Sequence, residues 1–288
     1  MATYNNSRFT YAQVLNNEGY YMKDDSLTYS AGVKTMQQKL NKAGYWCGTS
    51  DGKFGDGTDE SVRHFQRSYE LTVDGKAGRN TLSVLDVVSA RSPGFTKTAG
   101  NYGVYFCESN KKFMYNQQTV YDTLRAAGLN NISIAGFMGN LHAEHEFRTA
   151  LNGDSGSIGL AQWLGTRKTN LQRYAKASSM DITSIILQAL FIVEECTAGS
   201  GYTDSSANTC MNYLKDGHTI TTVIKATDYI TALYERCKNF SSWSAVQSSG
   251  YNTNRFSTQA NAQNGKYYLD TPKRRGYAEE YYKCICKM

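Results

Sequence analysis

Two glutamates in one apolar segment differ in the surroundings that their spacing predicts. The run IAGFMGNLHAEHEF, residues 134–147, places its apolar residues on one stripe of a helix at about 100° per residue. Glu144 lies at the margin of that stripe, whereas Glu146 points about 200° away from Glu144, toward solvent. Apolar surroundings disfavour the charged form of a carboxyl group and raise its pKa. Glu144 is therefore a candidate general acid, the group that protonates the leaving oxygen when a glycosidic bond breaks.

The same segment allows a structural interpretation. Glu144 could be a surface carboxylate that pairs with Arg148 one helical turn later. His145 falls inside the apolar stripe, which favours a buried histidine with one satisfied hydrogen bond over a proton relay. The helix is expected to begin at Asn131 or Ser133, because either side chain can cap it.

Glycoside cleavage usually needs a second carboxylate, and the sequence offers two candidates. Asp154 lies in the glycine-rich loop NGDSGSIG, and Glu235 follows the run TDYITALY. Asp154 could equally belong to an ordinary turn, and Glu235 could pair with Arg236 or Arg275. If neither carboxylate faces Glu144, the sugar's own hydroxyl would attack and the reaction would be that of a lytic transglycosylase.

A short repeat marks a different unit nearer the start of the chain. DGKFGDGT begins at Asp51 and DGKAGRNT begins at Asp74, and apolar residues at helical spacing follow each copy. The glycines allow positive φ, and Thr58 and Thr81 can each cap the helix that follows. The pattern predicts three helices joined by two matched turns over about residues 32–88.

The run from Val33 to Leu85 resembles the peptidoglycan-binding domain 1 family. Its landmarks are a helix with Gln-x-x-Leu, then D-G-x-F-G-x-x-T-x-x-x-V-x-x-F-Q, then V-D-G-x-x-G-x-x-T-x-x-x-L. The resemblance implies a module that holds an enzyme on the bacterial cell wall. Sugar rings would stack on exposed aromatic side chains, for which Tyr45, Trp46 and Phe54 are candidates, although each could instead belong to the core.

The later part of the chain resembles the phage lysozyme family of tail-associated lysozymes and endolysins. The family pattern A-G-x-x-G-N-x-x-x-E matches residues 135–144, and G-L-x-Q-W-x-G-x-R matches residues 159–167. An aromatic-Glu-Arg landmark at 234–236 and the run RRGYAEEYYKCI extend the match. The resemblance covers about residues 113–237 and 272–286.

This resemblance implies a mainly α, lysozyme-like α+β domain in which a helical lobe and a small β lobe flank a saccharide cleft. It makes Glu144 the catalytic acid and puts Gln162 and Trp163 across the cleft. Gln162 would hydrogen-bond an N-acetyl group and Trp163 would pack on a sugar ring, or else Trp163 fills the core of a structural hairpin. The chain departs from the family at His145, where a serine is usual, and at residues 238–271, which look like an insertion.

The length of 288 residues suits two domains. We expect an N-terminal extension at residues 1–31, a peptidoglycan-binding domain at 32–88, a linker at 89–103, and the lysozyme-like domain at 104–288.

Composition narrows the choice of partners. The net charge of +6 comes without a dense basic stripe, so no nucleic-acid partner is expected. No apolar run is long enough to insert into a membrane, and the first thirty residues do not read as a signal peptide. The HAEHE run lacks zinc-ligand spacing and the seven cysteines are irregularly spaced, so we expect no metal and no other cofactor. The oligomeric state stays open.

These features predict a peptidoglycan glycosidase of the lysozyme, or muramidase, type that cleaves β-1,4 bonds of glycan strands. A lytic transglycosylase acting on the same bond is one alternative, and a non-catalytic wall-binding or virion protein is another. The combination of domains resembles a bacteriolytic phage endolysin. Such a protein would stay in the host cytoplasm until lysis and then act on the cell wall.

Overall fold

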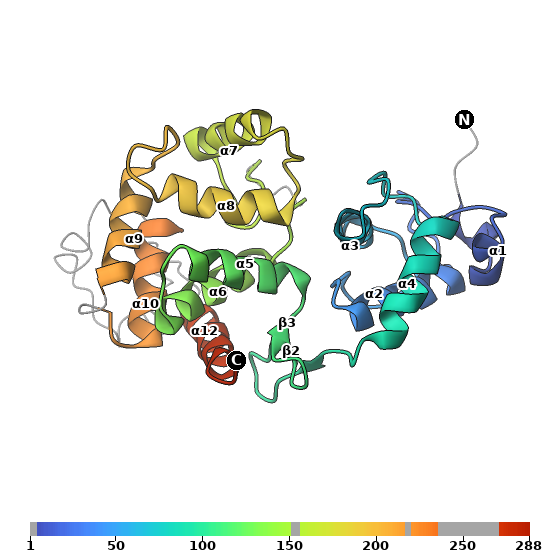
Figure 1. The fold of residues 1–288 in the computed structure, drawn as a ribbon, viewed down its shortest axis with the longest axis horizontal. Coiled ribbons are helices and arrows are strands. Elements are labelled where there is room, and N and C mark those ends of the chain that lie inside the picture. Colours follow the sequence, from blue (N-terminus) through green and yellow to red (C-terminus); the bar gives the residue numbers. More distant parts are fainter. Residues whose placement is uncertain (1–4, 151–155, 217–219, 236–270) are drawn as a thin grey trace. The chain divides into compact units, whose positions relative to one another are not determined.

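The computed structural model describes residues 5–150, 156–216, 220–235 and 271–288, and it divides into two compact units (Figure 1). Unit 1 comprises Met1–Thr96 and Tyr105–Asn116, and unit 2 comprises Lys97–Val104 and Gln117–Met288. Helices dominate, and the described residues add a small sheet in the order β1-β2-β3, so the prediction of a mainly helical protein is confirmed. No helix in these ranges is long and apolar enough to cross a membrane.

Unit 1 is built on the three helices that the sequence predicts. Its elements are η1 (Asn6–Arg8), α1 (Tyr11–Leu15), α2 (Ala31–Ala43), α3 (Asp56–Ser68), α4 (Arg79–Arg91), and the hairpin of β2 (Tyr105–Cys107) and β3 (Lys112–Phe113). Apolar residues from all three long helices are fully buried in one core, among them Met36, Phe65 and Leu85. Val14 and Tyr21 join the same core, so the described part of the N-terminal extension docks onto this unit.

The first repeated turn is held by a glutamine of α2. The Gln37 amide nitrogen donates to Asp51 Oδ1 (3.1 Å), to the Lys53 carbonyl (3.0 Å) and to Thr58 Oγ1 (3.0 Å). Its amide oxygen accepts from the backbone nitrogen of Gly52 at 2.8 Å. One side chain thus closes the whole turn.

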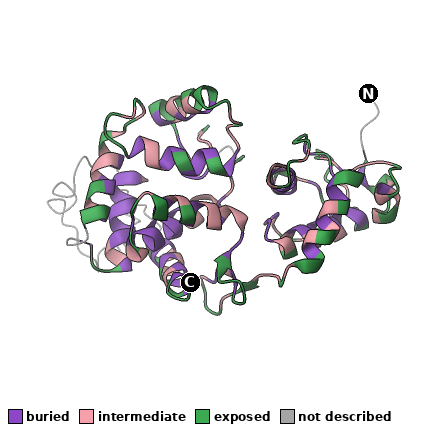
Figure 2. Ribbon diagram, in the orientation of Figure 1, coloured by how far each residue is buried: buried purple, intermediate pink, exposed green. Residues whose placement is uncertain are grey.

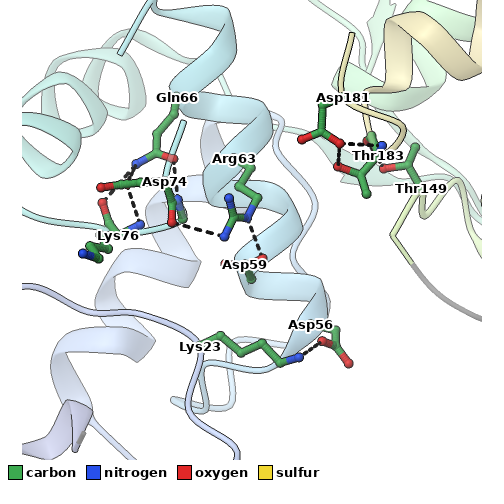
Figure 3. A network of polar contacts seen from close by, with 11 residues as sticks. Lys23, Asp56, Asp59, Arg63, Gln66, Asp74, Lys76, Thr149, Asp181 and Thr183 are labelled. Atoms are coloured by element: carbon green, nitrogen blue, oxygen red, sulfur yellow. Dashed lines mark hydrogen bonds and ion pairs between the residues drawn. The ribbon is translucent and has the colours of Figure 1, made fainter. Parts of the chain in front are cut away.

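The second turn repeats this arrangement with a glutamine of α3 (Figure 3). Gln66 donates to Asp74 Oδ1 (3.0 Å), to the Lys76 carbonyl (3.0 Å) and to Thr81 Oγ1 (3.3 Å), and it accepts from the nitrogen of Gly75 (3.0 Å). The sequence repeat is therefore a repeat of one hydrogen-bonded turn.

The threonines do not cap the helices, so that prediction is wrong. The capping positions are Gly55 and Gly78, and neither helix has a side-chain cap. Thr58 and Thr81 lie inside the first turns, where their hydroxyl groups accept from the glutamines. Part of the predicted linker at residues 89–103 has regular secondary structure, because α4 runs to Arg91 and residues 96–97 form β1.

Unit 2 surrounds one central helix. Its elements are β1 (Thr96–Lys97, which begins in unit 1), α5 (Tyr115–Ala126, likewise), α6 (Asn131–His145), α7 (Gly165–Ala177), α8 (Ile185–Glu195), α9 (Ser205–Asp216), α10 (Val223–Tyr229), the π-helix η2 (Ile230–Tyr234) and α12 (Thr271–Ile285). Helix α6 packs against α10 and α12. Of the predicted insertion at residues 238–271, residues 238–270 lie outside the described part of the chain.

Helix α6 is buried on every side from Ser133 to Leu141, not along one stripe as its periodicity predicts (Figure 2). Two glycines explain why neighbouring helices approach so closely. A Cβ on Gly136 would lie 3.0 Å from backbone atoms of α10, and one on Gly139 would lie 2.6 Å from backbone atoms of α12. The cap of α6 is Asn130, which accepts from the nitrogen of Ser133 at 2.9 Å, instead of either predicted residue.

Candidate active site

Glu144 lies in the last turn of α6 and is partly exposed, at 21% of its side chain. Its carboxylate accepts a hydrogen bond from the Arg274 guanidinium of α12, and the two side chains form an ion pair. This contact corrects both expectations for the surroundings of Glu144. The partner is Arg274 and not Arg148, and a buried guanidinium stands beside the carboxylate at the edge of the apolar helix. Glu146 is exposed, as predicted.

A buried asparagine fixes the arginine. Asn140 Oδ1 accepts from Arg274 Nη1 at 3.0 Å and from Thr231 Oγ1 at 2.7 Å. Its amide nitrogen donates to the carbonyls of Gly136 (2.9 Å) and Thr227 (3.1 Å). Asn140 is fully buried, so these contacts hold three helical segments in register at the position from which Arg274 reaches Glu144.

The neighbouring arginine has a different role. Arg275 forms two hydrogen bonds with the Asp228 carboxylate, at 2.8 and 2.7 Å, and both side chains are buried. This pair joins α12 to α10. Arg275 therefore pairs with Asp228 instead of the predicted Glu235, and the other predicted partner of Glu235, Arg236, lies outside the described residues.

Glu235 follows the π-helix η2 directly. Its backbone nitrogen donates to the carbonyl of Ile230, five residues earlier. The residue is partly exposed, yet its carboxyl oxygen Oε1 is buried without a hydrogen-bond partner among the described residues. Burial, and then the negative charge of Glu144, raise the pKa of Glu235 to about 8, although Arg274 and Arg167 oppose the shift. The raised pKa favours the protonated form of Glu235.

A buried carboxylate of α8, that of Glu195, helps to fix the chain next to Glu235. Glu195 is 1% exposed and accepts two hydrogen bonds from Arg167, both of 2.8 Å. It also accepts from the indole nitrogen of Trp163 (2.8 Å) and from the hydroxyl of Tyr234. Because Arg167 donates in turn to the Tyr234 carbonyl at 2.9 Å, the network fixes the peptide that precedes Glu235.

These contacts correct the predicted role of Trp163. Its side chain is fully buried and packs edge-to-face on Phe191, with ring centroids 5.4 Å apart. The indole has no exposed face for a sugar ring, so the core-filling alternative describes this residue.

Gln162 is engaged within its own turn. Ser157 Oγ donates to its amide oxygen at 2.7 Å, and its amide nitrogen donates to the Gly159 carbonyl at 2.8 Å. An antiparallel bridge between Ile158 and Trp163 closes the turn. Both ends of the amide thus stabilise the turn, and an N-acetyl group would have to compete with these bonds.

Two of the three aromatic candidates in unit 1 are buried. Tyr45 is 7% exposed and Phe54 is fully buried, so neither offers a face to a sugar. Trp46 is partly exposed, and its ring lies against Tyr105 with centroids 4.7 Å apart. It is the remaining member of the predicted set with accessible surface.

Two histidines flank Glu144 on α6. His142 stacks on Tyr277 at 3.8 Å and shares a 2.7 Å hydrogen bond with the Tyr281 hydroxyl, and burial lowers its pKa to about 3. Burial also lowers the pKa of His145, whose Nε2 is buried and has no hydrogen-bond partner among the described residues. Both rings are therefore neutral near pH 7. The candidate Asp154 lies outside the described residues.

Sequence reasoning missed Arg274 and Glu195, whose partners are distant in the chain. Glu144 and Arg274 are 130 residues apart, and Arg167 and Glu195 are 28 apart. Within the described ranges, no group of three or more His, Cys, Asp or Glu side chains is arranged to hold a metal ion.

Comparison with known proteins agrees with this architecture. The phage tail lysozyme family matches residues 115–285, and a putative peptidoglycan binding domain matches residues 29–85. The chain is also similar to the N-acetylmuramoyl-L-alanine amidase CwlM of Mycobacterium tuberculosis, with 38% identity over 66 residues that cover 23% of this chain and 16% of that protein. It is 37% identical over 76 residues to the spore cortex-lytic enzyme of Bacillus cereus, covering 25% of this chain and 29% of the relative. The chain thus spans less than a third of the length of either relative.

Proposed function

The chain belongs to the phage tail lysozyme family, and from this premise we propose that it hydrolyses the β-1,4 bonds of peptidoglycan glycan strands as a muramidase-type lysozyme. The peptidoglycan-binding domain makes the cell wall its partner. Similarity to two cell-wall lytic proteins supports lytic activity in general, while the bond that is cut belongs to the proposal.

The observation that carries the proposal is the arrangement of two glutamates around Arg274. Glu144 is partly exposed at the end of α6, and burial of the Glu235 carboxyl, together with the negative charge of Glu144, raises the pKa of Glu235. The negative charge of Glu144 is one of the causes that raise the pKa of Glu235, so the two carboxyl groups act on each other electrostatically. We assign proton delivery to Glu144, because its partly exposed side chain can reach the leaving oxygen of a bound sugar.

A conservative exchange tests this assignment. Glu144→Gln keeps the shape of the side chain and removes its proton, so wall-degrading activity should fall about a hundredfold or more. Glu146→Gln is the matched control, because Glu146 is exposed and two residues away, and it should retain full activity. A folded Glu144→Gln variant with undiminished activity would overturn the assignment.

Glu235→Gln separates the roles of the two carboxyl groups. If Glu235 only shares its surroundings with Glu144, the neutral amide should retain activity within about tenfold. A loss as large as that of Glu144→Gln would instead make Glu235 the proton donor.

One observation favours a second candidate function, that of a lytic transglycosylase. Hydrolysis uses an ionised second carboxylate as a nucleophile or to activate water, and the raised pKa of Glu235 disfavours that charge. Asp154 would have to provide it. If Asp154 does not, the sugar's own hydroxyl attacks and the product is an anhydro ring.

We further propose that the protein is a phage endolysin. In that case it waits in the host cytoplasm and reaches the wall at lysis. A binding domain joined to a catalytic domain raises the local concentration of glycan strands around the catalytic site.

A further inference from the structure

We propose that a pocket beside the second repeated turn of unit 1 binds the carboxylate groups of peptidoglycan peptide stems. The pocket has a volume of about 320 Å³, and its lining includes Tyr20, Asp74, Lys76, Gly78, Arg79 and Asn80. The inference rests on the proposed function only in taking peptidoglycan as the partner, and it concerns binding instead of bond cleavage.

Two cations line this pocket without a carboxylate partner in the described part of the chain. Lys76 and Arg79 are both exposed, and the Lys76 ammonium lies 5.2 Å from the centre of the Tyr20 ring. The acidic residue of the lining, Asp74, already accepts from Gln66 and from the backbone nitrogen of Lys76. The pocket therefore offers positive charge to an anion from outside.

The N-terminal segment forms part of the pocket. Tyr21 and Ala77 exchange two backbone hydrogen bonds, of 3.1 and 2.7 Å, which fix the segment against the second turn. Tyr20 consequently takes its place in the lining together with Asn17 and Gly19. Residues that the sequence left without a role thus help to enclose the site.

The first repeated turn is an internal comparison, because it has the same scaffold and a different charge. Lys53 occupies the position of Lys76, but Asp56 stands where the second turn has Arg79. Asp56 is paired with Lys23 of the N-terminal segment at 2.7 Å (Figure 3). The positive pair is thus a property of the second turn and not of the shared turn geometry.

The chemistry of the wall explains why a carboxylate fits. Peptide stems end in carboxylates, and a guanidinium or ammonium group forms charge-assisted hydrogen bonds with them. An exposed ion pair of this kind contributes little by itself. Stems recur along every glycan strand, however, so a weak site is re-occupied many times while the protein stays near the wall.

The test uses the full chain and purified peptidoglycan sacculi freed of teichoic acids, with bound protein measured by sedimentation in the cold. The double variant Lys76→Gln/Arg79→Gln should bind about tenfold more weakly than the wild type. The matched double variant Lys53→Gln/Asp56→Asn should bind within about twofold of it. Sacculi whose carboxylates have been converted to amides should bind the wild type as weakly as the double variant.

Three results would overturn the proposal. They are undiminished binding by Lys76→Gln/Arg79→Gln, an equal loss in the first-turn variant, and a difference between the wild type and Lys76→Gln/Arg79→Gln that persists in full on amidated sacculi, where the carboxylates are absent. Since both side chains are exposed, the variant should keep the wild-type melting temperature, and Arg79→Asp, which copies the charge of the first turn, provides a second variant. Sedimentation reports binding even if the assignment of Glu144 fails, so the two proposals fail separately.

Discussion

Glu195 and Glu144 each pair with an arginine in unit 2, but the two carboxylates differ in how many hydrogen bonds they accept and in how exposed they are. Both oxygens of Glu195 accept hydrogen bonds, from Arg167 and from two aromatic side chains, and the residue is 1% exposed. Glu144 is partly exposed, and Arg274 is its partner within the described ranges. A carboxylate with every oxygen occupied has no capacity left for chemistry, whereas one with open positions can meet a substrate.

The comparison also distinguishes the two arginines that hold these sites. Arg167 connects a saturated carboxylate to the peptide before Glu235, and Arg274 connects a buried asparagine to Glu144. The first network stabilises the fold, and the second positions the carboxylate to which we assign the chemistry. The difference can be tested by removing single charges.

Stability gives the largest expected effect. Glu195→Gln leaves Arg167 buried without its counter-charge and should destabilise unit 2 by about 3–5 kcal/mol, because breaking a buried pair strands a charge. The readout is denaturant unfolding of the full chain. Glu194→Gln, on the less buried neighbouring position of α8, should change the free energy of unfolding by less than about 0.5 kcal/mol. An intact stability in Glu195→Gln would remove the distinction drawn above.

A smaller effect should follow from the raised pKa of Glu235. A carboxyl group whose pKa rises to about 8 on folding favours the folded state most at low pH, and that contribution is lost as the pH rises through the folded-state pKa. Glu235→Gln has no proton to lose. Its melting temperature should therefore match the wild type near about pH 5 and exceed it by several degrees near about pH 9.

Melting curves measured across this pH range check the idea. A constant offset in melting temperature between Glu235→Gln and the wild type would mean that Glu235 is ionised in the folded protein across this pH range. Arg274 and Arg167, which lower the pKa of Glu235, would then outweigh burial and the charge of Glu144, which raise it.

Local sequence patterns predicted the helices and turns, but they could not predict polar contacts between residues that are distant in the chain. Periodicity located α2 to α4, and the doubled DGK motif located both turns. The hydrogen bonds of Gln37 and Gln66 could not be read from spacing, because each glutamine reaches across a turn to the next helix, 21 residues away for Gln37 and 15 for Gln66.

The candidate site shows the same limit. A helical wheel places Glu144 at an apolar margin, but it cannot show that Arg274 approaches from another helix. The signals were Gly136, Gly139 and Asn140, since two small residues and one amide inside an apolar helix indicate close packing and a buried polar contact. The sequence allows Trp163 to pack on a sugar ring, because Glu195, which accepts the hydrogen bond of its buried indole, is distant in the chain.

The most direct measurement of the central claim is a mass spectrum of purified peptidoglycan after digestion by the wild type and by Glu144→Gln. The proposal predicts soluble fragments with reducing muramic acid ends from the wild type and almost none from the variant. Anhydro ends would point to the transglycosylase. Glycan strands left uncut, with or without severed peptide stems, would contradict a glycosidase centred on Glu144.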